Sequence, residues 1–520
     1  AGMDYSQVLA KEFDIKEEYA QNVIALLDDG NTIPFIARYR KEATGALNDE
    51  VLRSFDERLR YLRNLEARKT TILSTIEEQG KLTEELRRQI EDAETMVALE
   101  DLYRPYKPKR RTRAMIAREK GLAPLANALR LGCPDPKKEA EKFVDPEKEI
   151  PDIETALSMA KDILAEEISD DADYRKAIRA MTYRSGLLTS KAKEKEPDPQ
   201  SVYANYYDYS EALKKIPGHR ILAINRGEKE KVLTVGIAAP VEDILSYLSD
   251  KMQVRRNPSC TPYLEEAISD AYKRLIAPSI ETELRSSLTE SAADSAITVF
   301  GTNLTQLLMQ PPVQGKTVLG WDPAFRTGCK LAVVDPTGKV LDTVVIYPTA
   351  PQNRVEESKK TLSRLVDRYK VDLISVGNGT ASRESEAVIA EFIRECPRPL
   401  QYVIVNEAGA SVYSASKLAT EEFPDFDVGQ RSAASIARRL QDPLAELVKI
   451  DPKAIGVGQY QHDCPQKELD AALGGVVEDC VNAVGVDVNT ASRSLLQQVS
   501  GLTATTAKNI VAFREETGPF

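Results

Sequence analysis

The sequence predicts a multidomain, mainly α-helical protein that contains one α/β domain and ends in a helical hairpin. Three observations lead to this prediction. The chain has 520 residues, which is too many for a single hydrophobic core. Up to about residue 315, its apolar residues recur at three- and four-residue spacing, as on one face of a helix. After Gly315, short β-branched runs alternate with helical segments, an order typical of an α/β domain.

The composition is that of a globular protein and limits its chemistry. Apolar residues make up 42% of the chain, yet no apolar run approaches the roughly 18 residues of a membrane span. We therefore expect a cytoplasmic protein without membrane contact. The six cysteines form no C-x-x-C pair, and His219 and His462 are the two histidines, so we expect no metal site and no cofactor. A net charge of −11 excludes a wholly basic surface but allows local basic patches.

The helical part is expected to comprise two regions. Residues 1–70 predict an N-terminal helical region, and residues 71–314 predict a central helical domain. The central domain ends in a long amphipathic stretch, which predicts a scaffold helix or two collinear helices. A charged, proline-bearing connector is expected at 191–200. A small β insert with a turn at RGEKE is expected near 219–237.

Residues 315–450 have the element order of an RNase H-like domain. Three strand-like runs joined by short turns predict an antiparallel meander, and two further strands then alternate with helices. After the meander we expect a helix near 352–369, a strand in VDLISVGN, a helix near 382–395, a strand in LQYVIVNE, and helices near 410–420 and 430–449. Residues 451–489 predict a connecting helical segment.

A domain of this type can hold a two-metal nuclease site, but the set of carboxylates is incomplete here. Such a site needs three or four carboxylates from different strand ends. Asp322 ends the first strand and Glu407 follows the fifth, whereas the fourth strand ends at the neutral amide of Asn378. The last helix presents arginines at 438 and 439 before Asp442. We expect no catalysis and regard Asp322, Glu407 and Asp442 as vestigial. A metal-dependent nuclease or resolvase built on them remains the alternative.

Residues 103–121 are the most basic stretch of an otherwise acidic chain. Lysine and arginine gain affinity for phosphates by releasing condensed counterions, and the interleaved Tyr103 and Tyr106 could stack on exposed bases. The predicted phosphate-binding residues are Arg104, Lys107, Lys109, Arg110, Arg111 and Arg113. The alternative is a solvated loop whose cations pair with neighbouring aspartates and glutamates.

Residues 490–520 predict a helix-hairpin-helix. Gly501 permits a tight turn that brings backbone N–H groups close to a phosphate. The second helix opens at Thr503, and Lys508 follows one turn later. We therefore predict that Gly501, Thr503 and Lys508 contact a nucleic-acid backbone without reading its sequence. A role in packing alone is the alternative.

The run IGVGQYQHDC, residues 455–464, contains His462 beside Asp463. No serine or cysteine nucleophile with a supporting turn accompanies this pair in the sequence. We expect His462 to orient a loop.

Six runs together are specific enough to indicate a family. They are NTIPFIARYRKEATGALND, ALEDLYRPYKPKRRTRAMIAREKGL, LGWDPAFRTGCKLAVVD, VNEAGASVYSASKLATEEFPD, SIARRLQDPLAELVKIDPKAIGVGQYQHD and SGLTATTAKNIVAFREETGPF. They resemble the bacterial Tex transcription accessory proteins, which are relatives of a eukaryotic elongation factor that travels with RNA polymerase. Ala324 stands where the family usually has a glycine.

The resemblance implies a helix-turn-helix-like N-terminal portion, a long central helix and a YqgF domain of the resolvase-like RNase H type. It also implies tandem helix-hairpin-helix motifs and a C-terminal OB-fold RNA-binding domain. The printed residues end at Phe520, inside the hairpin region, so we expect this chain to bind nucleic acid weakly.

The leading interpretation is a nucleic-acid-binding scaffold of the transcription machinery, without catalysis. Its expected partners are RNA, DNA or both, largely independent of sequence, and the resemblance adds RNA polymerase or ribosome-associated components. The two alternatives are the nuclease or resolvase and a pure protein-interaction scaffold.

Overall fold

The computed structural model describes residues 2–194, 198–499 and 501–520, and the chain divides into two compact units. The first unit comprises 1–14 and 54–293, and the second comprises 15–53 and 294–520. Part of the predicted connector, 195–197, lies outside the described residues. Among the described residues, no helix has the length and apolar character needed to cross a membrane.

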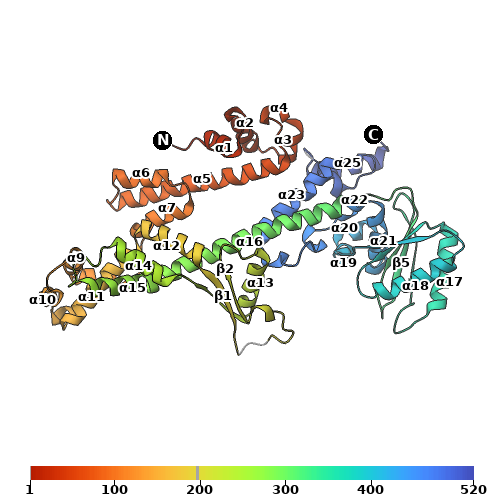
Figure 1. The fold of residues 1–520 in the computed structure, drawn as a ribbon. Coiled ribbons are helices and arrows are strands. Elements are labelled where there is room, and N and C mark those ends of the chain that lie inside the picture. Colours follow the sequence, from red (N-terminus) through yellow and green to blue (C-terminus); the bar gives the residue numbers. More distant parts are fainter. Residues whose placement is uncertain (1, 195–197, 500) are drawn as a thin grey trace. The chain divides into compact units, whose positions relative to one another are not determined.

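Most of the first unit is helical, and side-chain caps determine where several helices begin (Figure 1). Thr112 accepts a hydrogen bond from the backbone N–H of Met115, and Asp152 accepts one from Thr155. Such caps satisfy N–H groups that have no partner within the helix. The helices are α1 (Tyr5–Phe13), most of α5 (Asp49–Glu78), α6 (Glu84–Asp92), α7 (Met96–Tyr103), α8 (Arg113–Glu119), α9 (Ala123–Leu131), α10 (Pro136–Glu141), α11 (Ile153–Ser169), α12 (Ala172–Ser185), α13 (Gly218–Lys229), α14 (Val241–Lys251), α15 (Thr261–Asp270) and the start of α16 (Ala277–Leu308). The predicted boundary at residue 70 falls inside α5, and the domain boundaries stay predictions.

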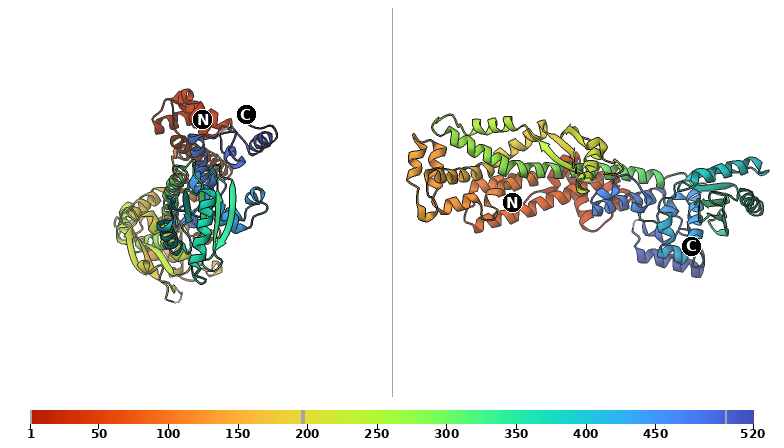
Figure 2. Two further views of the ribbon diagram at one scale, coloured as in Figure 1. Left: turned by 90° about the vertical axis from the view of Figure 1, so that its right-hand side faces the viewer. Right: turned by 90° about the horizontal axis from the view of Figure 1, so that it is seen from below.

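The predicted scaffold helix is present and is interrupted once. Helices α15 and α16 follow one another through a π-helical turn at Ala271–Ile276 (Figure 2). A π turn adds a residue to the helix and changes the direction of the side chains near it. Arg274 lies in this turn.

The small β insert is present, but its predicted position is partly wrong. The antiparallel sheet has the order β2-β1-β3, from β1 (Leu187–Ala192), β2 (Asp208–Ala212) and β3 (Leu233–Ala238). The run that begins at His219, predicted as strand, forms helix α13 instead. Ile221, Leu222 and Ile224 are buried, and their spacing fits one helical face better than alternate sides of a strand.

The RNase H-like element order is confirmed in the second unit. Its sheet has the order β6-β5-β4-β7-β8, in which β4, β5 and β6 pair antiparallel and β7 and β8 pair parallel. The elements are β4 (Val318–Asp322), β5 (Cys329–Val334), β6 (Val340–Ile346), α17 (Val355–Tyr369), β7 (Leu373–Gly377), α18 (Ser382–Glu395), β8 (Gln401–Val405), α19 (Ala410–Ser414), α20 (Lys417–Glu422) and α21 (Val428–Gln441).

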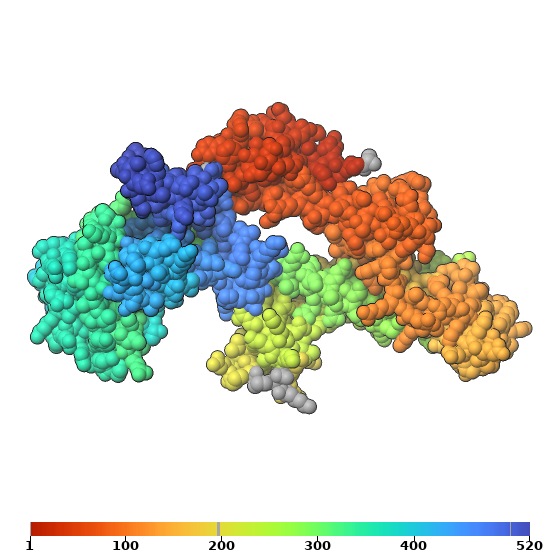
Figure 3. Space-filling model, turned by 180° about the vertical axis from the view of Figure 1, so that it is seen from behind, coloured from red at the N-terminus to blue at the C-terminus, as the bar shows by residue number. Residues whose placement is uncertain are grey.

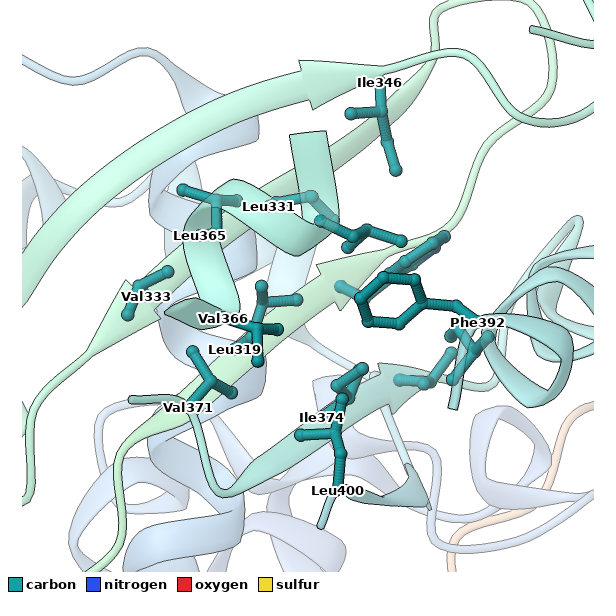
Figure 4. Close-up of a cluster of buried hydrophobic side chains, with 14 of the residues drawn as sticks. Leu319, Leu331, Val333, Ile346, Leu365, Val366, Val371, Ile374, Phe392 and Leu400 are labelled. Atoms are coloured by element: carbon teal, nitrogen blue, oxygen red, sulfur yellow. The ribbon is translucent and has the colours of Figure 1, made fainter. Parts of the chain in front are cut away.

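The two faces of this sheet are packed differently. On one face an aliphatic core forms against α17 and α18, and Figure 4 shows Leu319, Ile374 and Phe392 gathered within it. On the other face α21 lies close to β4, because Gly320 has no side chain. A Cβ at Gly320 would collide with the backbone carbonyl of Ala433. The carboxylate of Asp322, two residues after Gly320, lies on the α21 face.

The last predicted helix of the domain, 430–449, is in fact two helices. Helix α21 ends at Gln441 and α22 (Pro443–Leu447) follows, because Pro443 cannot continue the preceding hydrogen-bond pattern. Asp442 caps the second helix. The rest of the unit comprises α2 (Glu17–Asp28), α3 (Ile33–Tyr39), α4 (Lys41–Thr44), α23 (Gln466–Val484), α24 (Arg493–Gln497) and α25 (Ala504–Thr517).

Candidate functional site

The basic segment lines a cleft of about 540 Å³ in the first unit. It runs from a short 3₁₀ turn at Arg104–Tyr106 to the start of α8, and α11 and the π-helical turn form the opposite side. The helices α6 to α11 form the orange-to-yellow surface in Figure 3. The charged and polar residues of the lining are Arg104, Lys107, Lys109, Arg110, Arg111, Thr112, Arg113, Asp162, Glu166, Ser169, Asp170 and Arg274. All six basic residues predicted in this segment therefore share one cleft.

Three of the six predicted cations are engaged by carboxylates. The ammonium group of Lys109 donates to Asp170 and lies 3.8 Å from Glu166. Arg104 lies 3.7 Å from Asp170, and Arg111 donates to Glu119 at 2.9 Å. For these three side chains, the alternative to phosphate binding, which is pairing with neighbouring aspartates and glutamates, is therefore correct.

The other three predicted cations are free of such partners. Lys107, Arg110 and Arg113 are exposed, and none of them makes an ion pair with the residues that the structure describes. Exposed, unpaired cations can exchange their counterions for phosphates without first breaking a contact within the protein. These side chains, which we call the rim cations, are the part of the cleft best suited to bind an anion.

The expectation that Tyr103 stacks on bases is wrong. Its ring is buried in the core between α5, α6 and α7, and Arg68 lies over it at 5.3 Å. Tyr106 packs against the same core. Tyr103 is the last residue of α7 and Tyr106 ends the 3₁₀ turn after it, so both tyrosines are spaced to pack against this core.

Sequence reasoning missed the acidic floor of the cleft and one of its cations. Asp162 and Glu166 come from one face of α11, Asp170 caps the C-terminal end of that helix, and Arg274 comes from the π-helical turn. Burial raises the pKa of Asp162 and of Asp170 above the usual aspartate value. These residues lie far along the chain from the basic segment, so no local pattern could have linked them.

The predicted hairpin is formed by α24 and α25. Gly501 has φ +86°, and a Cβ there would meet open space, so conformation rather than crowding favours glycine. The hydroxyl of Thr503 accepts from the backbone N–H of Thr506 and so caps α25. Lys508 is exposed on the same helix. The three predicted residues thus lie within one short segment.

Two of the predicted carboxylates in the RNase H-like domain meet. Asp322 ends β4, Glu407 follows β8, and their carboxyl groups lie next to each other. Glycines 377 and 379 make room, because a Cβ at either would collide with the Glu407 carboxylate. Between them, Asn378 accepts from the backbone N–H of Glu407 at 3.1 Å. Asn378 therefore positions the Glu407 backbone.

Burial raises the pKa of both carboxyl groups of the pair. Burial and the neighbouring Asp322 charge raise the pKa of Glu407 to about 7. Burial also raises the pKa of Asp322, while hydrogen bonding from Ser432 and the charge of Lys330 oppose that shift. Glu407 is therefore the carboxyl group of the pair that keeps a proton up to about pH 7.

Of the two arginines at 438 and 439, Arg439 lies beside the carboxylate pair and Arg438 does not. Arg438 donates to the carbonyl of Gly338 and pairs with Glu422 at 3.0 Å. Arg439, buried under the sheet, donates to the carbonyls of Asn406 and Ala408, on either side of Glu407. The Asp322 carboxylate instead meets α21 one to two turns earlier, at Ser432.

Asp442 is not brought to the pair. It lies ten residues after Ser432, which corresponds to about 15 Å along a helix axis. Its side chain accepts from the backbone N–H of Ala445 and so caps α22. The neighbouring Gln441 donates to the carbonyl of Lys316, just before β4 begins, so Asp442 lies near the other end of that strand. Asp442 therefore caps α22 and does not belong to the carboxylate pair.

The carboxylate pair does not fit two divalent metal ions. Two-metal sites need three or four converging carboxylates, whereas this one has two, with the neutral amide of Asn378 and the hydroxyl of Ser432 nearby. In the described ranges, no group of three or more histidine, cysteine, aspartate or glutamate side chains could hold a metal ion. The site therefore consists of two carboxyl groups, both with a raised pKa, beside the Ser432 hydroxyl and the Arg439 guanidinium.

The loop at 455–464 is held by Gln461. This side chain is buried, and its amide donates to the carbonyl of Lys453 and accepts from the backbone N–H of Val457 at 3.1 Å. His462 is exposed. The expectation that His462 orients the loop is therefore wrong, and the adjacent glutamine does so.

Four family models match the chain. Residues 3–77 match the Tex-like protein N-terminal domain, and 133–300 match the Tex central region. Residues 316–441 match the Tex protein YqgF-like domain, and 481–520 match a helix-hairpin-helix motif. The RNase H-like sheet and the hairpin lie within the last two ranges.

The chain is also similar over its whole length to curated proteins. It is 50% identical to "Protein tex" of Bordetella pertussis, over 100% of this chain and 68% of that protein. It is 47% identical to "Transcriptional accessory protein Tex" of Neisseria gonorrhoeae, over 100% of this chain and 69% of that protein. The human "S1 RNA-binding domain-containing protein 1" is 39% identical over 99% of this chain and 53% of its own length.

Proposed function

The chain belongs to the Tex family, and from this premise we propose that it is a nucleic-acid-binding accessory protein of transcription whose basic cleft contacts phosphates. The rim cations Lys107, Arg110 and Arg113 carry this proposal, because they are exposed on one cleft and lack ion-pair partners among the described residues. Phosphate contacts of this kind give affinity without sequence specificity.

The hairpin around Gly501 supplies a second, smaller contact in this proposal. The N-terminus of α25 offers backbone N–H groups, and Lys508 adds a charge. The printed names of the relatives mention transcription and RNA binding, which supports the same class of ligand. Polymerase or ribosome-associated partners remain predictions from the family resemblance.

The proposal assigns no catalysis to the RNase H-like domain. The support for this is that two carboxyl groups, Asp322 and Glu407, lie together and that Ser432 rather than a third acid meets them from α21. A cleavage assay with Mg²⁺ and Mn²⁺ on single-stranded, duplex and branched substrates tests this assignment. Cleavage that disappears in Asp322→Asn would establish the nuclease alternative instead.

The binding proposal is tested by reversing the rim charges together, as Lys107→Glu, Arg110→Glu and Arg113→Glu. The matched control reverses three exposed cations outside the cleft in the same unit, Lys81, Arg88 and Lys148. Filter binding to RNA and DNA at several salt concentrations should show at least a tenfold loss for the rim variant only. The slope of log affinity against log salt should fall by about 0.7 to 0.9 for each lost phosphate contact.

Two results would contradict the proposal. One is the absence of binding by the unaltered chain at low salt. The other is an equal loss in the rim variant and the control, which would mean that net charge rather than the cleft determines affinity.

A further inference from the structure

We propose that the cleft receives one unpaired nucleotide of a single strand, with its phosphates on the rim cations and the N–H edge of a guanine base on Asp162. The inference rests on the proposed function, since it names the ligand class of the same cleft.

The cleft carries opposite charges at different depths. Seven cationic side chains and three carboxylates line it, and the carboxylates come from α11 and its C-cap residue. Asp162, Glu166 and Asp170 are spaced by four residues, so they share one helix face and form an acidic floor. A phosphate is attracted to the exposed rim and repelled by the floor. A ligand that fills the cleft must therefore be anionic on the outside and offer hydrogen-bond donors on the inside.

Asp162 is the floor carboxylate that still needs donors. Glu166 accepts from the hydroxyl of Thr112 at 2.8 Å, and Asp170 accepts from Lys109. Asp162 makes no hydrogen bond or ion pair with the residues that the structure describes, although it is half-buried. A half-buried carboxylate that has no protein donor is open to a ligand that supplies N–H groups in place of water.

The surrounding cations keep Asp162 in its ionised, accepting form. The charges of Arg274 and Arg113 oppose the rise in the pKa of Asp162 that burial causes. Arg274 is itself fixed by two hydrogen bonds to Asp270, of 2.9 and 2.8 Å. Asp270 and Lys161 are the other charges that act on Asp162. The carboxylate thus lines the cleft as an acceptor between Arg274, which is held by Asp270, and the exposed Arg113.

Guanine is the base that matches such an acceptor. An ionised carboxylate accepts two parallel N–H bonds, and guanine presents its ring N1–H and its 2-amino group side by side. In a duplex this edge is paired with cytosine, so an unpaired strand alone offers it. A volume of about 540 Å³ lies within the range typical of small-ligand pockets.

Fluorescence anisotropy with short oligonucleotides tests the inference on the unaltered chain. An oligouridylate with one central guanosine is compared with the same strand carrying inosine, which lacks the 2-amino group, and with uridine. We expect about tenfold tighter binding of the guanosine strand than of the inosine strand, in line with the discrimination that a lost base contact causes. A duplex that contains the same guanosine should lose the preference.

Asp162→Asn should remove the preference for guanosine over inosine and leave the salt dependence unchanged. The matched control is Asp173→Asn, an exposed aspartate on α12 that does not line the cleft, and it should keep the preference. Equal binding of the guanosine, inosine and uridine strands would overturn the inference while the proposed function stands. If no strand binds, the proposed function itself fails.

Discussion

The basic cleft and the carboxylate pair bring charged side chains together in opposite ways. At the pair, Asp322 and Glu407 lie against each other inside the protein, close to Ser432 and Arg439, and α21 covers them. In the cleft, the rim cations are exposed and have no ion-pair partner among the described residues. Charges satisfied within the protein contribute to its structure, whereas unsatisfied charges at a surface are available to a ligand. Substitutions at the pair should therefore change stability, and substitutions at the rim should change binding.

The largest effect is expected where α21 meets the sheet. Gly320→Ala places a Cβ against the backbone of Ala433, which cannot yield without moving the helix. We expect a loss of about 3 kcal/mol or more in the free energy of unfolding of this domain. Trp321, the single tryptophan of the chain, is fully buried beside it and reports the transition by fluorescence in denaturant.

Gly474→Ala is the matched control for that measurement. Gly474 lies inside α23 in the same unit, and a Cβ there meets open space. The expected change is a gain of up to about 1 kcal/mol in helix stability, from the higher helix propensity of alanine. Similar losses for both variants would refute the close-packing explanation.

Within the cleft, Lys109 and Lys107 should behave differently. Lys109→Ala leaves the carboxylates of Asp170 and Glu166 without their main cation, and should destabilise α8 and α11 by about 1 to 3 kcal/mol. Hydrogen exchange of the amides in these helices measures this loss. Lys107→Ala should leave the exchange unchanged and lower the affinity for single strands instead. Equal exchange in the two variants would contradict the division into paired and rim cations.

The raised pKa of Glu407 predicts that the stability of the domain depends on pH, with a smaller effect than the substitutions above. The pKa of Glu407 in the folded chain is about 7, above its ordinary value of 4.5, so the folded state binds more protons than the unfolded state between these values. The stability of the domain should fall as the pH rises from 4.5 to 7. Glu407→Gln removes this loss, so its advantage over the unaltered chain should grow to about 1 kcal/mol at pH 8, after allowance for solvent screening. A difference in unfolding free energy between Glu407→Gln and the unaltered chain that does not change with pH would argue against a raised pKa of Glu407.

The smallest effect is expected at the hairpin. Lys508→Ala removes one exposed charge near the N-terminus of α25, and should weaken binding about two- to fivefold and reduce the salt slope by less than one. The same assay on Gly501→Ala, which strains a φ of +86°, should show a loss of similar size. No change in either variant would limit binding to the cleft.

The sequence predicted the elements of the RNase H-like domain well, because each strand and helix there carries its own periodicity and turn residues. The prediction failed at 218–229, where a short apolar run fits both the helical and the strand periodicity, and a strand was predicted where the structure has helix α13. It also placed Asp442 in a site, although Pro443 directly after it favours a helix cap.

The sites depended on contacts between distant segments, and these were less predictable. The basic segment was visible as a run, but the acidic floor from α11 and Arg274 from the π-helical turn were not. The glycines on either side of Asn378 were a usable signal, since they indicate that another group approaches the end of β7. Which of the clustered cations lack partners depends on the positions of distant acids, and only the structure supplies those positions.

The most direct test of the central claim is photo-crosslinking of the unaltered chain to an RNA strand that contains 4-thiouridine, with the linked peptides identified by mass spectrometry. We expect crosslinks concentrated in residues 103–121 and in α11, and their loss when the rim charges are reversed. Crosslinks confined to the loops around Asp322 and Glu407, with none in the cleft, would contradict the account.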